Sequence, residues 1–193
     1  MRHDLTTRWL HAGIALGVTA QLGLSLLMEA PDDKDEVLAS GLPLQLFEAH
    51  ENIGMALLAL LVLHWLWSLS GHVEDGFGHL FPWFSKERMG KVKIEVREAL
   101  KFRVSNPEIS NALAGVVHGL GLLAATGMAA TGVVIFFNLS EAGHMTKLGE
   151  IFHSIHGTIA PLMWAYLIGH VALAVIHKRM GHANVQEMFS LFK

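Results

Sequence analysis

Two histidines in the last hydrophobic stretch of the chain, His156 and His170, are the residues whose type and spacing best indicate chemistry. Their separation of fourteen residues corresponds in an α-helix to about 1400° of rotation, within about 40° of four whole turns, and to about 21 Å of rise. Both imidazoles therefore point to the same side of a helix that is long enough to cross a bilayer. Histidines are costly in a membrane segment and are usually functional there. The arrangement suits two haems stacked across a membrane, each with its iron bound axially by a histidine.

The composition of the whole chain is that of an integral membrane protein. Of its 193 residues, 52% are hydrophobic and only 16% are charged, and the mean hydropathy is +0.41. This is too apolar for an ordinary soluble domain of this size. The chain has no cysteine, which excludes disulfides, cysteine-ligated iron–sulfur clusters and covalently attached c-type haem. We therefore expect any haem to be held by ligation and packing alone.

Four segments are apolar and long enough to be membrane spans, because a hydrocarbon core of about 30 Å needs about 20 residues of helix. They are residues 9–28, 47–70, 112–139 and 151–177. The sequence thus predicts an all-α protein, an integral membrane four-helix bundle that forms one domain over residues 1–193. A cleaved signal peptide is the competing interpretation of the first segment, and we disfavour it because residues 25–30 contain no clear cleavage site between small residues.

Lysine and arginine predict the orientation of these spans. Twelve of the fourteen lie at the N-terminus, in the loop 71–111 or in the C-terminal tail, and by the positive-inside rule these three parts are cytoplasmic. The loop itself alternates apolar and basic residues after Pro82. This pattern predicts a basic amphipathic connector between the second and third spans, which lies on the inner membrane surface.

The predicted orientation sorts the histidines by depth. The candidates are His50, His153 and His156 at the outer level, and His11, His64, His118 and His170 at the inner level. A haem iron with two histidine ligands needs imidazoles on opposite sides of the porphyrin, at one depth and from different helices. Both levels supply such a pair, and the residues alone leave the choice of partners open.

Several motifs follow one another along the chain. They are Arg8-Trp-Leu-His11-Ala, His50-Glu-Asn-Ile-Gly54, Pro82-Trp-Phe, Ser105-Asn-Pro-Glu-Ile-Ser-Asn-Ala-Leu-Ala-Gly115, the pair His156 and His170, and Val185-Gln-Glu-Met188. In these motifs nearly the whole chain resembles the bacterial cytochrome b561 and Ni,Fe-hydrogenase b-type cytochrome family, which are four-helix dihaem membrane proteins. The resemblance implies two non-covalent b haems with bis-histidine ligation: His50 and His156 bind the outer iron, and His11 and His170 bind the inner one. It also implies a bacterial inner-membrane protein, in which the distribution of lysine and arginine places both termini in the cytoplasm.

His64 is the alternative inner ligand. His50 and His64 are also fourteen residues apart, which resembles the cytochromes b of quinol–cytochrome c oxidoreductases, where two helices each carry both ligands. If they are not ligands, His64 and His118 are expected to bond haem propionates, to line a quinone pocket or to fill polar positions between helices. For His153 we expect an interfacial position, with proton carriage or outer ligation as alternatives.

The predicted function is single-electron transfer across the bilayer. The resemblance implies quinone or quinol as substrate and a redox partner protein: a c-type cytochrome, a hydrogenase-like protein or another oxidoreductase subunit. Membrane lipid surrounds the spans, and no nucleic-acid partner is expected. No nucleophile–base arrangement indicates a catalytic residue, and the sequence leaves open whether the chain is an enzyme in its own right.

Two alternative functions are kept. The first is a superoxide:quinone oxidoreductase of the same family, against which the acidic loop after the first span argues, because it would repel an anion. The second is an ion or metal transporter that uses histidines. The absence of thiolates and the scarcity of carboxylates within the spans argue against it.

Overall fold

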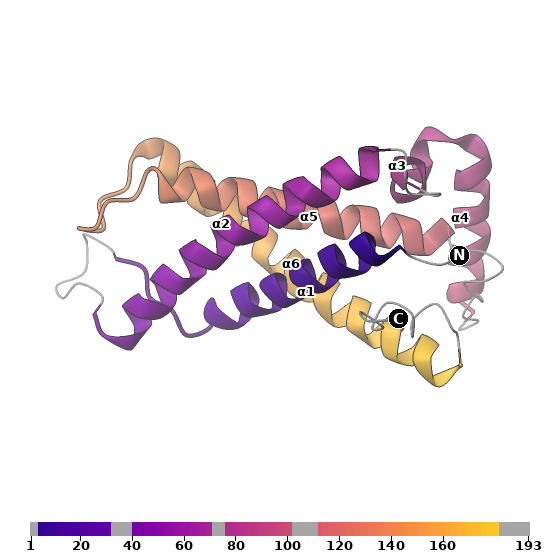
Figure 1. Cartoon of the computed structure of the whole chain (residues 1–193), viewed down its shortest axis with the longest axis horizontal. Coiled ribbons are helices and arrows are strands. Elements are labelled where there is room, and N and C mark those ends of the chain that lie inside the picture. The colour runs from indigo at the N-terminus through magenta and orange to yellow at the C-terminus, as the bar shows by residue number, and fades with distance from the viewer. Residues whose placement is uncertain (1–3, 32–39, 71–75, 102–111, 182–193) are drawn as a thin grey trace. The chain divides into compact units, whose positions relative to one another are not determined.

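The computed structural model of the chain describes residues 4–31, 40–70, 76–101 and 112–181 (Figure 1). In this part of the chain all regular structure is helical, and the only β-type pairing is an isolated bridge between Leu139 and Met145. The α-helices are α1 (Leu5–Leu24), α2 (Leu42–Leu69), α3 (Gly76–Leu80), α4 (Lys86–Ala99), α5 (Ala112–Phe136) and α6 (Lys147–Arg179), with a short 3-10 helix, η1 (Pro82–Phe84), before α4. The predicted all-α class is confirmed for these residues.

Three of the helices are long and apolar enough to cross a membrane. They are α2, α5 and α6, with 28, 25 and 33 residues, and they overlap the predicted spans 47–70, 112–139 and 151–177. The helix α1 has 20 residues but is not among these candidates. Polar side chains such as Arg8, His11 and Gln21 lower its hydropathy. A fourth span over residues 9–28 therefore stays a prediction.

Backbone contacts divide the chain into two compact units, each built from segments that are far apart in the sequence. The first unit is Met1–Ala12, Leu63–Leu123 and Ile168–Lys193, and the second is Gly13–Val62 and Ala124–Leu167. The inner-level histidines all belong to the first unit and the outer-level histidines all belong to the second. The single domain over residues 1–193 stays a prediction.

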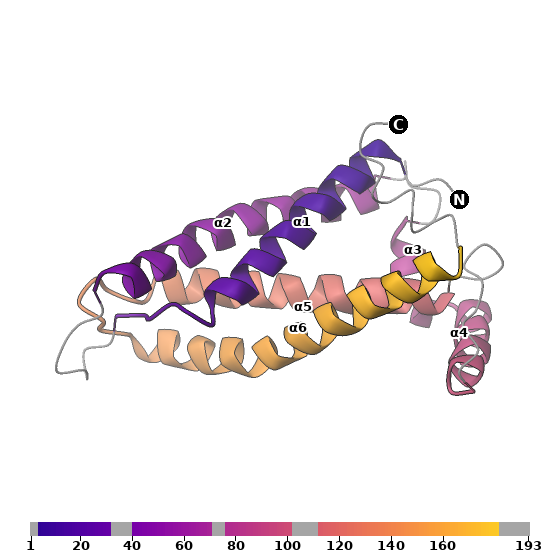
Figure 2. The same ribbon diagram turned by 90° about the horizontal axis from the view of Figure 1, so that it is seen from below.

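In the first unit, α4 begins at a capped N-terminus and runs crosswise to α5 in two perpendicular views (Figures 1 and 2). The Ser85 side chain accepts a hydrogen bond from the Arg88 N–H at 3.4 Å, as an N-cap residue does. Glu95 lies on the buried face of α4 and is only 6% exposed. Its carboxylate oxygens accept the backbone N–H groups of Ala112 and Leu113 at 3.1 and 3.0 Å. Glu95 thus caps the positive end of α5 and ties the connector to that helix.

The short helix α3 approaches α5 at Gly119, the residue after His118. A Cβ atom at Gly119 would overlap the backbone carbonyl oxygen of Leu80, the last residue of α3. Only glycine permits this approach, because backbone cannot move aside as a flexible side chain can. Aromatic rings fill the space beyond α3, where Trp65 stacks on Phe81 with ring centroids 5.8 Å apart. The contact places α3 beside the part of α5 that carries His118.

In the second unit, the C-terminal half of α5 and the N-terminal half of α6 lie side by side (Figures 1 and 2). The hairpin that joins them is closed by hydrogen bonds from Ser140 N–H to His144 O at 3.0 Å and from Thr146 Oγ1 to Asn138 Oδ1 at 2.6 Å. Small residues also allow α1 to approach α2. Cβ atoms built at Gly13 and Gly17 would lie 3.1 Å from Leu60 and 3.0 Å from Leu57, which is typical of close packing between membrane helices.

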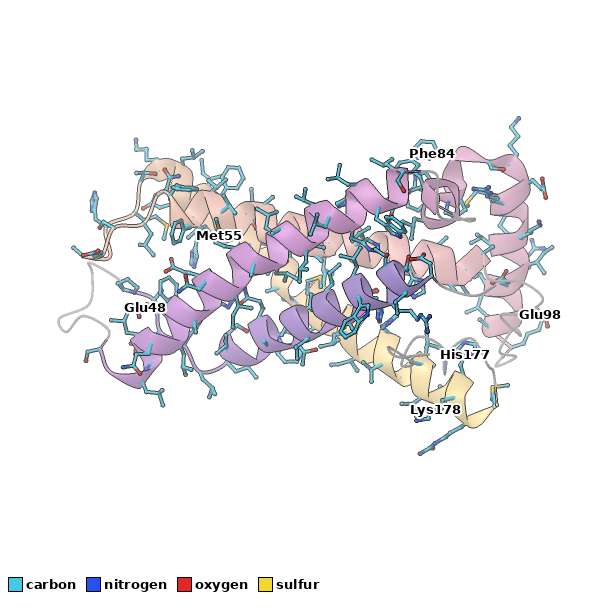
Figure 3. The ribbon with its side chains drawn as sticks, in the orientation of Figure 1. Glu48, Met55, Phe84, Glu98, His177 and Lys178 are labelled. Carbon is cyan, nitrogen blue, oxygen red and sulfur yellow. The ribbon has the colours of Figure 1, made fainter. Side chains whose placement is uncertain are left out.

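The helix α6 carries both histidines of the fourteen-residue pair and continues across Pro161. Its last turn contains the basic residues His177, Lys178 and Arg179. Basic side chains at this end stabilise the helix, because the C-terminal end of the helix dipole is negative. Figure 3 shows the side chains of His177 and Lys178 at this end of the helix. Beyond it, Gly181 adopts a φ of 79°, the left-handed conformation that commonly ends helices.

Candidate functional site

A mostly apolar cavity of about 180 Å³ lies within the second unit. Its walls come from all four helical segments of the unit. The polar or charged residues that line it are Gln21, His50, Glu51, His153 and His156. A concave apolar site with a few convergent polar groups is typical of a binding site for a small molecule or cofactor.

His50 of α2 and His156 of α6 face each other across this unit. Their ring centroids are 6.4 Å apart and the ring planes are inclined by 75°. Both residues are half-buried, whereas His153 borders the same cavity but is exposed. The structure therefore brings together the two histidines that the resemblance assigned to one haem.

The first unit brings together a second set of histidines around His170. The His11 and His170 centroids are 6.2 Å apart with planes inclined by 48°. The His118 and His170 centroids are only 5.3 Å apart with planes inclined by 66°. His64 lies in the same unit, near the end of α2, and is half-buried. The fold thus offers His170 two imidazole neighbours, from α1 and from α5.

The ring separations distinguish these neighbours. An imidazole nitrogen lies about 2 Å from a bound first-row metal and about 1.1 Å from its own ring centroid, so two imidazoles on opposite sides of one metal have centroids about 6.3 Å apart. The separations of 6.4 Å for His50 and His156 and 6.2 Å for His11 and His170 fit this value. The 5.3 Å between His118 and His170 is too short for it and suits an edge-to-face contact.

Both sites fit a metal that brings its own equatorial ligands. In the described ranges no group of three or more His, Asp or Glu side chains is placed to hold a metal ion, and a bare zinc or similar ion needs about four ligands. Two opposed imidazoles are what haem iron requires from a protein, because the porphyrin supplies the other four nitrogens. The donor set therefore fits haem and does not fit a bare ion.

Buried polar atoms without partners among the described residues occur in both units, and two of them, on His50 and Gln21, belong to residues that line the cavity of the second unit. His50 Nδ1, His64 Nδ1 and Gln21 Oε1 are buried and have no hydrogen-bond partner among the described residues. Such atoms are rare in folded proteins and call for a water, an ion or a bound group. Unpartnered polar atoms on the cavity wall fit a site that is occupied by a bound group.

Hydrogen bonds hold the N-terminal part of α1 in the first unit. The Asp4 carboxylate accepts bonds from the Thr7 N–H at 2.9 Å and from the Thr7 hydroxyl at 2.6 Å, and Trp67 Nε1 donates to Thr7 Oγ1 at 3.1 Å. Burial alone would raise the pKa of the Asp4 carboxyl, but these hydrogen bonds lower it below its usual value. The network joins the start of α1 to the end of α2, one helical turn from His11.

Two site residues escaped the sequence analysis. Thr131 Oγ1 lies 2.8 Å from His156 Nδ1, and Gln21 Nε2 donates to the backbone carbonyl of His50 at 2.8 Å. Both are polar residues inside apolar helices, and this was the signal that could have identified them. Next to Thr131, Gly132 also borders the imidazole: a Cβ built there would lie 3.6 Å from His156 Cε1, an ordinary van der Waals distance.

The chain is similar over almost its full length to a known protein family. A family model described as prokaryotic cytochrome b561 matches residues 2–191. No curated protein and no solved structure matched the chain.

Proposed function

Because the chain belongs to the prokaryotic cytochrome b561 family, whose members are membrane b-type cytochromes of electron transfer, we propose that it carries two haems and moves single electrons across the bilayer. The observation that carries the proposal is the pairing of imidazoles in each unit at 6.4 and 6.2 Å, the separation expected of two axial ligands. His50 and His156 hold one haem, and His11 and His170 hold the other. The family favours this function over a histidine-based ion or metal transporter.

The protein's own residues provide ligation and an apolar environment. When bound, haem supplies a one-electron couple between ferric and ferrous iron. The cavity around His50 and His156 is lined largely by aliphatic side chains, methionines and phenylalanines, which exclude water. His118 contacts His170 edge to face and helps to orient that ligand. Such surroundings tune the redox potential of a haem.

The electron route proposed here connects a quinone or quinol with a redox partner protein on the opposite side of the membrane. The fourth span, predicted over residues 9–28, is formed by α1 (Leu5–Leu24), because Arg8 lies in its first turn, where a long basic side chain can reach the membrane surface. Both termini are cytoplasmic in a bacterial inner membrane, as the distribution of lysine and arginine favours. This orientation makes the His50–His156 site the outer one and the His11–His170 site the inner one.

The connector helix α4 lies on the inner membrane surface. It runs crosswise to α5 (Figures 1 and 2), and a helix crosswise to a membrane span lies along the membrane plane. α4 carries five basic residues, which suit anionic lipid headgroups. Large apolar side chains are exposed on α4 and next to its ends: Ile94 at 62% on the helix, Phe84 at 76% before it and Leu100 at 77% after it. Basic charge together with exposed apolar side chains is typical of a helix at a membrane interface.

Single cysteines can test the placement of α4, because the chain contains none of its own. We expect Leu100→Cys to be protected from a membrane-impermeant maleimide in inverted vesicles and to react after detergent treatment. Glu87→Cys, at an exposed polar position of the same helix, should react in inverted vesicles but not in right-side-out cells. Equal labelling of both cysteines in intact inverted vesicles would contradict an interfacial α4, and labelling of Glu87→Cys from outside would reverse the orientation.

The dihaem proposal is tested by the ratio of haem to protein in the detergent-purified chain. We expect two b haems per chain and a reduced-minus-oxidised spectrum typical of low-spin iron with two histidine ligands. A chain that binds one haem after expression with ample haem supply would limit the proposal to one of the two sites. A chain that binds none would overturn it.

A further inference from the structure

We infer that Thr131 is a positioning residue for His156: its hydroxyl accepts a hydrogen bond from His156 Nδ1 and so leaves Nε2 as the metal-binding nitrogen. The inference rests on the proposed role of His156 as a haem ligand. Thr131 lies on α5 and His156 on α6, both within the second unit. Thr131 is 6% exposed, so no bulk water competes for its hydroxyl.

The direction of the hydrogen bond follows from the three partners of one hydroxyl. Thr131 Oγ1 lies 2.8 Å from Gly127 O, 2.9 Å from Met128 O and 2.8 Å from His156 Nδ1. Backbone carbonyls can only accept, and two oxygens only 2.8–2.9 Å apart repel each other unless a proton lies between them, so the single hydroxyl proton of Thr131 goes to one of the carbonyls. The hydroxyl then faces His156 with a lone pair, and Nδ1 must carry the proton of the neutral imidazole. This assigns the tautomer in which Nε2 has its lone pair free for a metal.

The same contact has a consequence for the strength of the ligand. A metal-bound histidine commonly donates its second ring N–H to an oxygen, and this bond fixes the ring and raises its basicity. A more basic axial imidazole favours ferric over ferrous iron and lowers the haem potential. His50 differs, because its Nδ1 is buried without a hydrogen-bond partner among the described residues. The two imidazoles of this site are therefore unequal, with His156 the anchored one.

Thr131→Val tests the inference, because it exchanges the hydroxyl for a methyl group of similar size. In the full-length protein with haem bound, we expect haem at this site to be lost to a competing apoprotein about 10-fold more readily. In a redox titration only one of the two haem waves should move, toward positive potential. A tenfold change in the relative affinity for ferric and ferrous haem corresponds to 59 mV for a one-electron couple. Thr131→Ser keeps the hydroxyl and should restore both values.

Thr158→Val is the matched control. Thr158 makes the same type of bond to the backbone carbonyl four residues earlier, Ser154 O at 2.8 Å, but it is exposed. Its replacement should move neither haem wave. The inference is overturned if Thr131→Val leaves haem affinity and both potentials unchanged while His156→Ala still loses a haem, or if Thr131→Ser and Thr131→Val behave alike. Retention of both haems by His156→Ala would instead refute the ligand assignment on which the inference rests.

Discussion

Replacing His156 by alanine should remove one of the two haems and leave the other in place. The centroid of His156 lies 6.4 Å from that of His50, so its loss leaves one side of the iron without a protein ligand. Among the described residues, His156 is the histidine whose ring pairs with that of His50, so we expect no substitute ligand to take its place. The measurement is the haem-to-protein ratio, with the low-spin spectrum of the remaining haem as proof that the rest of the protein is folded.

The control for this variant is His153→Ala. His153 is three residues earlier on α6 and borders the same cavity, but it is exposed and we expect the protein without it to keep both haems. Loss of a haem from His153→Ala, with both haems kept in His156→Ala, would make His153 the ligand. Loss of both haems from His156→Ala would show that the two sites do not fold independently.

Replacing His11 by alanine should remove the other haem, as should replacing its partner His170. The His11 and His170 centroids are 6.2 Å apart, which fits ligation of one iron from opposite sides at about 6.3 Å. The ring centroid of His118 lies 5.3 Å from that of His170, which is too close for ligation of one iron from opposite sides. We therefore expect the His118→Ala protein to keep both haems, with an altered potential of the haem bound by His11 and His170. Haem content and redox titration of the purified variants measure both effects.

His64→Ala is the matched comparison for His11→Ala. Both histidines are half-buried in the first unit, and the sequence offered both as inner ligands. We expect His64→Ala to bind two haems and His11→Ala to bind one. The reverse result would mean that α2 and α6 each carry ligands for both haems, and that α1 only supports the site.

The sequence was sufficient to predict the features that depend on one helix alone. The spacing of His156 and His170 defines one face of α6 wherever that helix lies, because rotation and rise per residue are constant in an α-helix. The apolar stretches predicted α2, α5 and α6 for the same reason. The ends were less accurate: α1 begins at Leu5 and ends at Leu24, where residues 9–28 were expected. Its start is set by the Asp4 cap on Thr7, a polar contact outside the apolar stretch.

Only the tertiary structure decided which residues of different helices meet. The sequence left three partners for His170, and the fold placed His11 and His118 beside it at different separations. In the sequence Thr131 and Glu95 are ordinary polar residues. In the structure the Thr131 hydroxyl is hydrogen-bonded to a ring nitrogen of His156, and Glu95 of α4 caps the N-terminus of α5. Membrane helices are apolar on all sides, since lipid is as apolar as the protein interior. Their hydrophobic pattern therefore does not specify which faces pack together, and that information resides in the close contacts between small and polar residues.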